Sequence, residues 1–181
     1  MSPEPPRPAD VAVAALRRAI STLTPTDERE AASVSRILTE LDRLPHPLDQ
    51  DAGPIHVTGS AIVVGPRGVL LHRHKRMGIW LQPGGHIDHG ETPWDTARRE
   101  TTEETGIRAA HPDSGPRLVH VDVHAGPRGH THLDVRYLLL AGDEVPTPPP
   151  GESPAVCWFS WSRAVAVADA GLVGALRRLR P

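Results

Sequence analysis

The chain contains 181 residues with a formal net charge of −2, 38% hydrophobic residues and a single cysteine, which suits one globular domain with an appendage. The near-neutral charge disfavours a nucleic-acid-binding surface, no apolar run is long enough to span a membrane, and the first residues lack the apolar core of a signal peptide. The lone Cys157 excludes an intramolecular disulfide, so we expect a soluble cytoplasmic protein in which this thiol is a small buried hydrophobe.

The first 50 residues are predicted to form a helical extension. Residues 1–9 are rich in proline and should be disordered or extended. Apolar side chains then recur every three or four positions over residues 10–23 and 26–44, which predicts two amphipathic helices. This region carries no group suited to catalysis, so its expected role is packing against the rest of the chain or forming a homodimer.

From residue 54 onward the pattern changes to β-strands separated by turns. A glycine turn is expected at 83–85. A proline-rich loop is expected at 145–153 and a closing helix at 161–179. Strands followed by a central helix, more strands and a last helix indicate an α/β fold with a mixed sheet between helices. The strands are predicted at residues 56–64, 68–74, 80–82, 118–124, 132–141 and 155–160.

The central helix is predicted from its ends. Thr92 suits the N-cap, Pro93 suits the first helical position, and Gly106 suits the left-handed residue that ends a helix. Between them, three glutamates stand at i, i+3 and i+4, so a helix places them on one face. Such a run alone is more often a solvated surface. The glutamates are Glu100, Glu103 and Glu104.

Three carboxylates on one helical turn repel one another unless a cation lies among them. Hard divalent cations such as Mg²⁺ and Mn²⁺ are the natural occupants of a site made only of oxygen, and Mg²⁺ is usually shared with substrate phosphates. The glycine turn before the helix allows the backbone to approach a ligand closely. The residues therefore indicate metal-assisted chemistry on a substrate that carries phosphate.

The complete spacing over residues 85–107 resembles the Nudix box, the signature of the Nudix hydrolases. One position departs, since the family prefers an aliphatic residue where this chain has Thr101. The resemblance covers roughly residues 54–181 and implies a Nudix-type α/β/α sandwich with a mixed β-sheet, preceded by the extension of residues 1–50. The matching residues are Gly85, Glu91, Arg99, Glu100, Glu103, Glu104, Gly106 and Ile107.

The resemblance implies a metal-dependent hydrolase that cleaves the diphosphate linkage of a nucleoside diphosphate joined to another moiety. Water attacks a phosphorus while Mg²⁺ or Mn²⁺ ions bound along the helix neutralise charge. Glu91 is implied to anchor the loop to the helix. The implied site residues are Arg99, which holds the glutamates in place, Glu100, a ligand or activator of water, the metal ligands Glu103 and Glu104, and the carbonyl of Gly84.

Nudix hydrolases often draw a further carboxylate from a distal loop, here the loop at 145–153. Glu152 is our choice for this catalytic residue, with Asp143 and Glu144 as competitors. Four residues near the expected cleft are interpreted as substrate-binding, namely Arg73, Arg76, Gln82 and His86. For Arg73, Arg76 and Gln82 the alternative is that they are simply solvated at the surface.

Eleven histidines raise the question of zinc. The chain lacks a matching set of cysteines and a His-Glu-x-x-His motif, so we do not expect a dedicated zinc site. The spaced pairs are His72 with His74, His86 with His89, and His130 with His132.

The substrate is expected to be a small diphosphate compound of the nucleotide sugar, ADP-ribose or nucleoside triphosphate class, or a non-nucleotide diphosphate. The alternative is a catalytically silent Nudix-fold module that binds nucleotides or regulates another protein. Such modules commonly have broken boxes, whereas this chain keeps Arg99, Glu100, Glu103 and Glu104.

Overall fold

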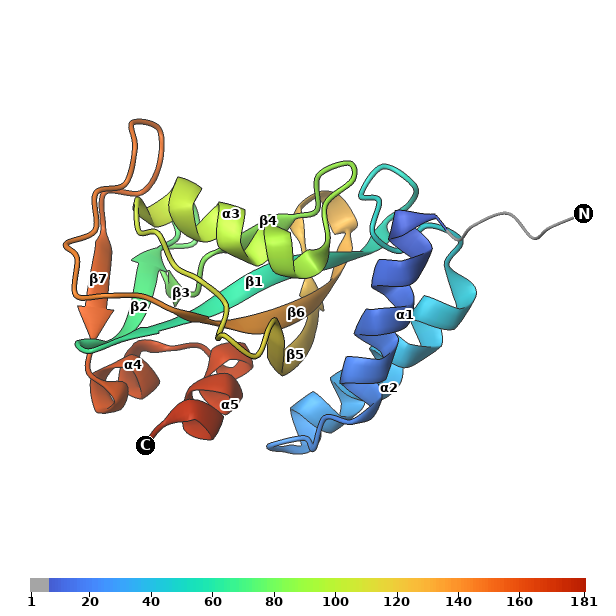
Figure 1. Ribbon diagram of the computed structural model, residues 1–181, viewed down its shortest axis with the longest axis horizontal. Coiled ribbons are helices and arrows are strands. Elements are labelled where there is room, and N and C mark those ends of the chain that lie inside the picture. The colour runs from blue at the N-terminus through green and yellow to red at the C-terminus, as the bar shows by residue number, and fades with distance from the viewer. Residues whose placement is uncertain (1–6) are drawn as a thin grey trace, which may run out of the picture.

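The computed structural model describes residues 7–181. The sequence expectation for residues 1–9 falls mostly on residues 1–6, which lie outside the described residues. Of the remaining three, Pro8 already begins a helix. Both N-terminal helices are present, as α1 (Pro8–Ser21) and α2 (Glu28–Arg43). Figure 1 shows them as an antiparallel pair at one end of the sheet.

The centre of the molecule is a seven-stranded mixed sheet, in which β1 pairs with β6 in parallel and the other pairs are antiparallel. The order is β3-β2-β1-β6-β5, while β4 also pairs with β1 and β7 with β2. The strands are β1 (Ile55–Gly65), β2 (Gly68–Arg73), β3 (Trp80–Leu81), β4 (Gly84–His86), β5 (Arg117–Ala125), β6 (Thr131–Leu140) and β7 (Val156–Phe159).

Helices cover both faces of this sheet, which confirms the expected α/β/α arrangement. In Figure 1, α3 (Pro93–Thr105) lies on one face, and α4 (Trp161–Val167) and α5 (Ala170–Leu179) lie on the other. The hydrophobic core accordingly has two parts. One lies between α1, α2, α3 and the sheet, and the other lies beneath α4 and α5.

The N-terminal helices share their core with the sheet. Leu16, Ile20 and Ile37 are fully buried in the same cluster as Val121 of β5 and Val135 of β6. Each such aliphatic side chain contributes about 1.5–3 kcal/mol by leaving water. The helical hairpin therefore packs on the sheet of its own chain, one of the two placements that the sequence left open.

In place of the expected glycine turn at 83–85, Gly84 and Gly85 belong to the short strand β4. Gly85 stands opposite Gly59 of β1, and Gly84 stands opposite Ser60. A Cβ on Gly84 would lie 2.2 Å from the Cβ of Ser60, and one on Gly85 would lie 2.3 Å from Oε1 of Glu100. The two glycines are needed because β4 lies too close to β1 at Gly84, and to the side chain of Glu100 on α3 at Gly85, for a Cβ to fit.

The single closing helix expected at 161–179 is divided into α4 and α5. Asp169 caps the second helix by accepting a hydrogen bond from the N–H of Leu172 at 2.9 Å. Ala168 is extended and forms a bridge with Trp80. The expectation was wrong here because an aspartate N-cap interrupts an otherwise continuous apolar pattern.

Two further sequence expectations concern the lone cysteine and membrane-spanning segments. Cys157 is exposed rather than buried, because it points away from the core on β7 while its neighbour Val156 points inward. Within residues 7–181, the structure contains no helix with the length and apolar character needed to cross a membrane.

Candidate functional site

Helix α3 carries the predicted carboxylates and forms for the expected local reasons. The hydroxyl of Thr92 accepts the N–H of Asp95 at 3.2 Å, and Gly106 ends the helix with a φ of 72°. Thr101, the one departure from the Nudix pattern, is fully buried and donates its hydroxyl to the carbonyl of Ala97 at 2.7 Å. Its inward packing leaves the glutamates on a different face of the helix, where Glu100 and Glu104 lie against β4.

Arg99 connects the glutamates to one another. Its guanidinium donates to Glu91 at 2.9 Å, to Glu100 at 2.8 Å and to Glu103 at 2.9 Å, and a further N–H reaches the carbonyl of His86 at 2.9 Å. Burial opposes the charge of Arg99, but the bonds to these carboxylates outweigh it and raise the pKa of the guanidinium. Arg99 thus fixes the loop before the helix and the helix itself in one arrangement.

Glu104 is the most strongly perturbed carboxylate of the helix. Its Oε2 accepts the backbone N–H of Gly84 at 3.0 Å. Burial raises the pKa of Glu104, the bond from Gly84 opposes this, and the charges of Glu100 and Glu152 raise it further, to about 8. Burial likewise raises the pKa of Glu100 against the opposing charge of Arg99. Both carboxyls are therefore harder to ionise than ordinary glutamates while no cation is bound.

His72 is a neighbour of this site that sequence analysis did not assign to it. It lies on β2, is 5% exposed, and its Nε2 stands 3.6 Å from Oε2 of Glu104. Burial and the neighbouring His74 lower the pKa of His72 to about 4, so it is neutral at pH 7. A histidine in an apolar strand gives no sequence signal of this contact, because the contact depends on how β2 and α3 pack.

The loop after β6 brings Glu152 toward the helix. Ser153 donates its hydroxyl to the carbonyl of Arg73 at 2.7 Å, which ties the loop to the end of β2. Of the three loop carboxylates considered, Glu152 has the largest effect on the pKa of Glu104. The backbone carbonyl of Glu144 instead accepts the indole N–H of Trp158 at 2.8 Å.

The four residues interpreted as substrate-binding fall into two pairs, with Arg73 and Arg76 at the turn that follows β2 and Gln82 and His86 beside β6. Arg73 donates to the carbonyl of Gly78 at 2.8 Å, and Arg76 lies in the exposed turn that follows β2. Gln82 donates to Asp134 at 3.2 Å, and Nε2 of His86 lies 3.3 Å from Nε2 of His132. The contacts of Gln82 and His86 thus place these two side chains on the sheet face opposite the carboxylates of α3, and a role of the four residues in substrate binding stays a prediction.

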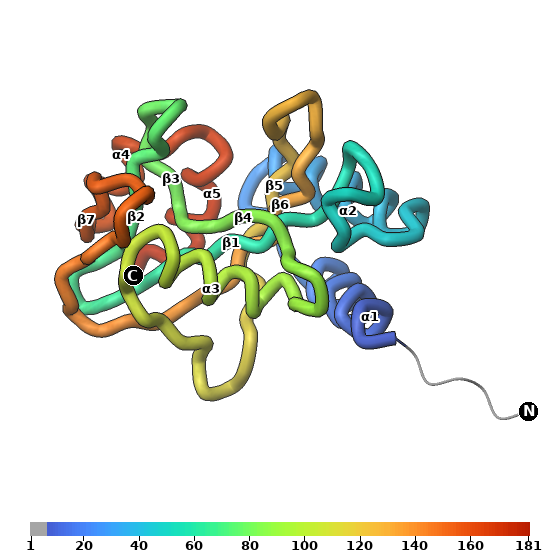
Figure 2. Tube along the Cα trace, turned by 90° about the horizontal axis from the view of Figure 1, so that it is seen from above, coloured from blue at the N-terminus to red at the C-terminus, as the bar shows by residue number. Residues whose placement is uncertain are grey.

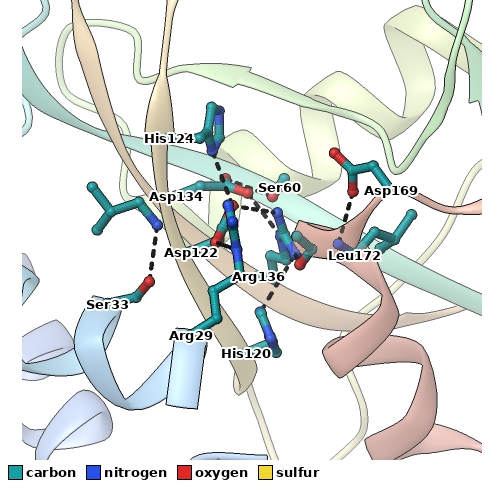
Figure 3. A network of polar contacts seen from close by, with 12 residues as sticks. Arg29, Ser33, Ser60, His120, Asp122, His124, Asp134, Arg136, Asp169 and Leu172 are labelled. Carbon is teal, nitrogen blue, oxygen red and sulfur yellow. Dashed lines mark hydrogen bonds and ion pairs between the residues drawn. The ribbon is translucent and has the colours of Figure 1, made fainter. Parts of the chain in front are cut away.

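The sheet face opposite α3 carries a buried network of charges (Figure 3). Arg136 donates to Asp134 at 2.8 Å and lies 3.6 Å from Asp122, while Arg29 of α2 donates to Asp122 at 2.7 Å. Burial alone would raise the pKa of Asp122, but hydrogen bonds from His124 and Arg29 outweigh it and hold the pKa well below its ordinary value. This network attaches the N-terminal helices to β5.

Asp122→Asn is expected to lower the free energy of unfolding by about 3 kcal/mol, the lower end of the cost of breaking a buried ion pair, because Arg136 keeps Asp134. The exposed pair of Arg17 and Asp42 at 2.6 Å supplies the control, since Asp42→Asn should cost less than about 1 kcal/mol. Urea unfolding at pH 7 measures both.

The sign of the pH dependence follows from the lowered pKa of Asp122. The stabilisation is present above the pKa that this carboxyl has in the unfolded chain and is lost as the pH falls toward the folded value. The difference in stability between wild type and Asp122→Asn should therefore shrink in acid. A difference that stayed constant from pH 7 to pH 3 would contradict the assignment.

A separate cavity of about 750 Å³ lies between α1, the loop of residues 45–51 and the loop of residues 87–92. Its walls include Asp49, Asp51 and Asp88, and it touches the box only along the loop of residues 87–92. The carboxylates of α3 are not part of its lining. This cavity is acidic, so it is a poor match for a phosphate group.

Comparison with curated proteins gives matches over part of the chain. It is 36% identical over 103 residues to the putative mutator protein MutT4 of Mycobacterium tuberculosis, covering 54% of this chain and 40% of that protein. It is 34% identical over 92 residues to a probable DHNTP pyrophosphohydrolase of Lactococcus lactis, covering 47% of this chain and 54% of the relative. The chain thus spans about half the length of these relatives, or less.

Solved structures agree with the fold. A NUDIX-family hydrolase from Clostridium perfringens superposes with a TM-score of 0.56 at 29% identity, covering 69% of this chain and 98% of that one. A MutT NUDIX hydrolase from Burkholderia pseudomallei gives 0.55 at 27% identity, covering 68% and 96%. The family model described as NUDIX domain matches residues 54–179, from the start of β1 to the end of α5, and the chain belongs to this family.

Proposed function

We propose that this protein hydrolyses a phosphoric anhydride bond in a small substrate, using Mg²⁺ or Mn²⁺ held by Glu100, Glu103, Glu104 and the carbonyl of Gly84. The observation that carries the proposal is the group of three carboxylates on α3, of which Arg99 binds Glu100 and Glu103, while Glu104 accepts the N–H of Gly84 on β4. A regulatory module has no need for negative charge concentrated in this way.

The residues fit a hard divalent cation. The donors are all oxygens, which Mg²⁺ and Mn²⁺ prefer. The raised pKa of Glu104 reflects burial together with uncompensated neighbouring carboxylates, which a dication would offset. Gly85 has no Cβ in the space occupied by the carboxylate of Glu100, so the oxygens can lie directly beside the strand.

Each residue has a distinct part in the proposed reaction. A bond forms between the oxygen of water and a phosphorus while the bond from that phosphorus to the bridging oxygen breaks, and the proton of water passes to a carboxylate. When bound, the metal lowers the pKa of water and neutralises phosphate charge. Glu100 is a ligand or the group that activates water, Arg99 holds the glutamates in position, and Glu152 adds a carboxylate from the loop.

The substrate class is proposed from the same family. The relatives named above include a probable DHNTP pyrophosphohydrolase, and a 42-residue segment is 58% identical to the mouse bis(5'-nucleosyl)-tetraphosphatase, covering 23% of this chain and 29% of that protein. A pyrophosphohydrolase and a tetraphosphatase both act on phosphoric anhydrides. Nucleotide sugars, ADP-ribose, nucleoside triphosphates and dinucleoside polyphosphates are therefore the compounds to test first.

The deciding experiment measures phosphate release from that panel with Mg²⁺ or Mn²⁺. We expect turnover of at least one compound, complete loss of turnover with EDTA, and recovery when Mg²⁺ is added in excess. Full activity after exhaustive chelation would disprove the metal mechanism. Tight binding of a compound without turnover under any metal condition would instead favour the silent module.

A further inference from the structure

Three histidines from three different strands meet on the sheet face opposite α3. His56 is on β1, His86 is on β4 and His132 is on β6, and one ring nitrogen of each lies within 4.8 Å of the other two. Because a Cβ on Gly85 would point at Glu100, the next residue of the strand, His86, points to the opposite face. The cluster is thus separated by the sheet from the carboxylates of α3.

The backbone holds these histidines in place before any ligand binds. His56 and His132 are directly paired residues of the parallel β1–β6 ladder. His86 is the last residue of β4, and its ladder partner is Thr58, two positions from His56 on the same face. Side chains in such positions are neighbours whatever else occurs, so little ordering entropy remains to be lost on binding.

His56 presents a lone pair that has no partner. Its Nδ1 lies 3.2 Å from the carbonyl of Gly53, a contact in which the nitrogen donates its proton. That bond leaves Nε2 deprotonated, and this atom is buried without a hydrogen-bond partner in a residue that is 0% exposed. A histidine held through one nitrogen by a carbonyl, with the other nitrogen free, has the arrangement of a metal ligand.

The other two rings already have the spacing of ligands on one ion. Nε2 of His86 and Nε2 of His132 are 3.3 Å apart. Two nitrogens bonded to a tetrahedral Zn²⁺ at about 2.0–2.1 Å lie about 3.3–3.4 Å from each other. Gly126 leaves room for the ring of His132, because a Cβ on residue 126 would lie 2.4 Å from Nε2 of His132.

The surrounding charge suits a cation. Burial keeps His56 and His132 neutral by lowering their pKa values, that of His132 to about 4. The carboxylates of Asp51 and Asp134 act on these rings in the opposite direction, which means that each lies within electrostatic range. Neutral imidazoles with nearby negative charge are the environment in which a divalent transition metal binds.

We propose that His56, His86 and His132 form a binding site for Zn²⁺ or a similar divalent transition metal, separate from the carboxylate site and leaving one coordination position for solvent. A metal here would join β1, β4 and β6. Since β4 also carries Gly84 and Gly85, the metal would fix the strand against which Glu100 and Glu104 are seated.

The test uses the full-length protein after removal of metals by EDTA. Zn²⁺ is titrated in the presence of millimolar Mg²⁺, which occupies oxygen sites but competes poorly for imidazole. We expect one Zn²⁺ per chain and a rise in Tm. His132→Asn should weaken Zn²⁺ binding by more than about 100-fold, beyond the 10–100-fold typical of residues that only support a ligand.

His89→Asn is the matched control, because this histidine is exposed and lies three residues after His86. It should bind Zn²⁺ as the wild type does. The proposal is overturned if Zn²⁺ binding survives His132→Asn, or if no binding occurs in millimolar Mg²⁺. It is also overturned if Glu104→Gln abolishes the binding, since the ion would then occupy the carboxylate site.

A second measurement avoids the possibility that a variant fails to fold. In the wild-type protein, the side-chain nitrogen resonances of the histidines are followed by NMR as Zn²⁺ is added. We expect Nε2 of His56, His86 and His132 to shift together at one equivalent, while His74 and His89 stay unchanged. Shifts confined to the exposed histidines would overturn the site.

Discussion

Glu104→Gln is expected to lower kcat by at least about 100-fold, with little change in fold. The substitution keeps the shape of the side chain and its bond from Gly84 but removes the charge directed at the metal, and losing one preorganised electrostatic group of this kind costs about 100- to 1000-fold in turnover. Glu103→Gln should act in the same direction. Its side chain is 56% exposed, so solvent can replace part of what is lost.

The same change should stabilise the protein when metal is withheld. Burial and the neighbouring carboxylates raise the pKa of Glu104 to about 8, so the metal-free protein must take up a proton there when it folds at pH 7, and a neutral amide removes that cost. The Tm in EDTA should therefore rise by a few degrees, and the extra stabilisation that Mg²⁺ gives the wild type should disappear.

Glu28→Gln provides the matched control, because this glutamate is exposed at the start of α2, far along the chain from the site. It should leave both kcat and the effect of Mg²⁺ on Tm unchanged. Steady-state kinetics at saturating metal and thermal melts with and without Mg²⁺ give the comparison. Near-wild-type kcat in Glu104→Gln would show that Glu104 is not a ligand.

The carboxylate helix was predictable because every signal for it is local. Thr92, Pro93 and Gly106 mark its ends within a few residues, and the glutamate spacing is a property of the helix itself. The N-terminal helices were predictable for the same reason, from their apolar periodicity. Whether they packed on this chain or on a second one was not, because an amphipathic stripe does not identify its partner.

The histidine cluster could not be read from the sequence. Its members are separated by 30 and 46 residues, and they meet only because β1 pairs with β4 on one side and with β6 on the other. The spaced histidine pairs pointed to the wrong combinations, since no two of the three cluster members belong to the same pair. Likewise, no local pattern indicates that Arg29 of α2 would bind Asp122 of β5.

Glu152→Gln is expected to lower kcat by about tenfold while changing KM by less than about threefold. Glu152 lies in an exposed loop, and its charge already acts on the pKa of Glu104. A loop carboxylate of this kind contributes most when the loop closes on bound substrate, so its loss should be felt in the chemical step rather than in binding. The smaller factor than for Glu104 reflects the looser attachment of the loop.

Asp143→Asn and Glu144→Gln are the matched controls, since they remove the same charge from the segment that leads into the loop. Both should keep kcat within about twofold of wild type. If one of them loses activity while Glu152→Gln does not, the loop carboxylate has been misassigned. If all three are silent, the carboxylates of α3 suffice for the reaction.

Ser153 holds the loop to β2 by donating a hydrogen bond to the carbonyl of Arg73. If the position of the loop determines turnover, Ser153→Ala should lower kcat, as Glu152→Gln does.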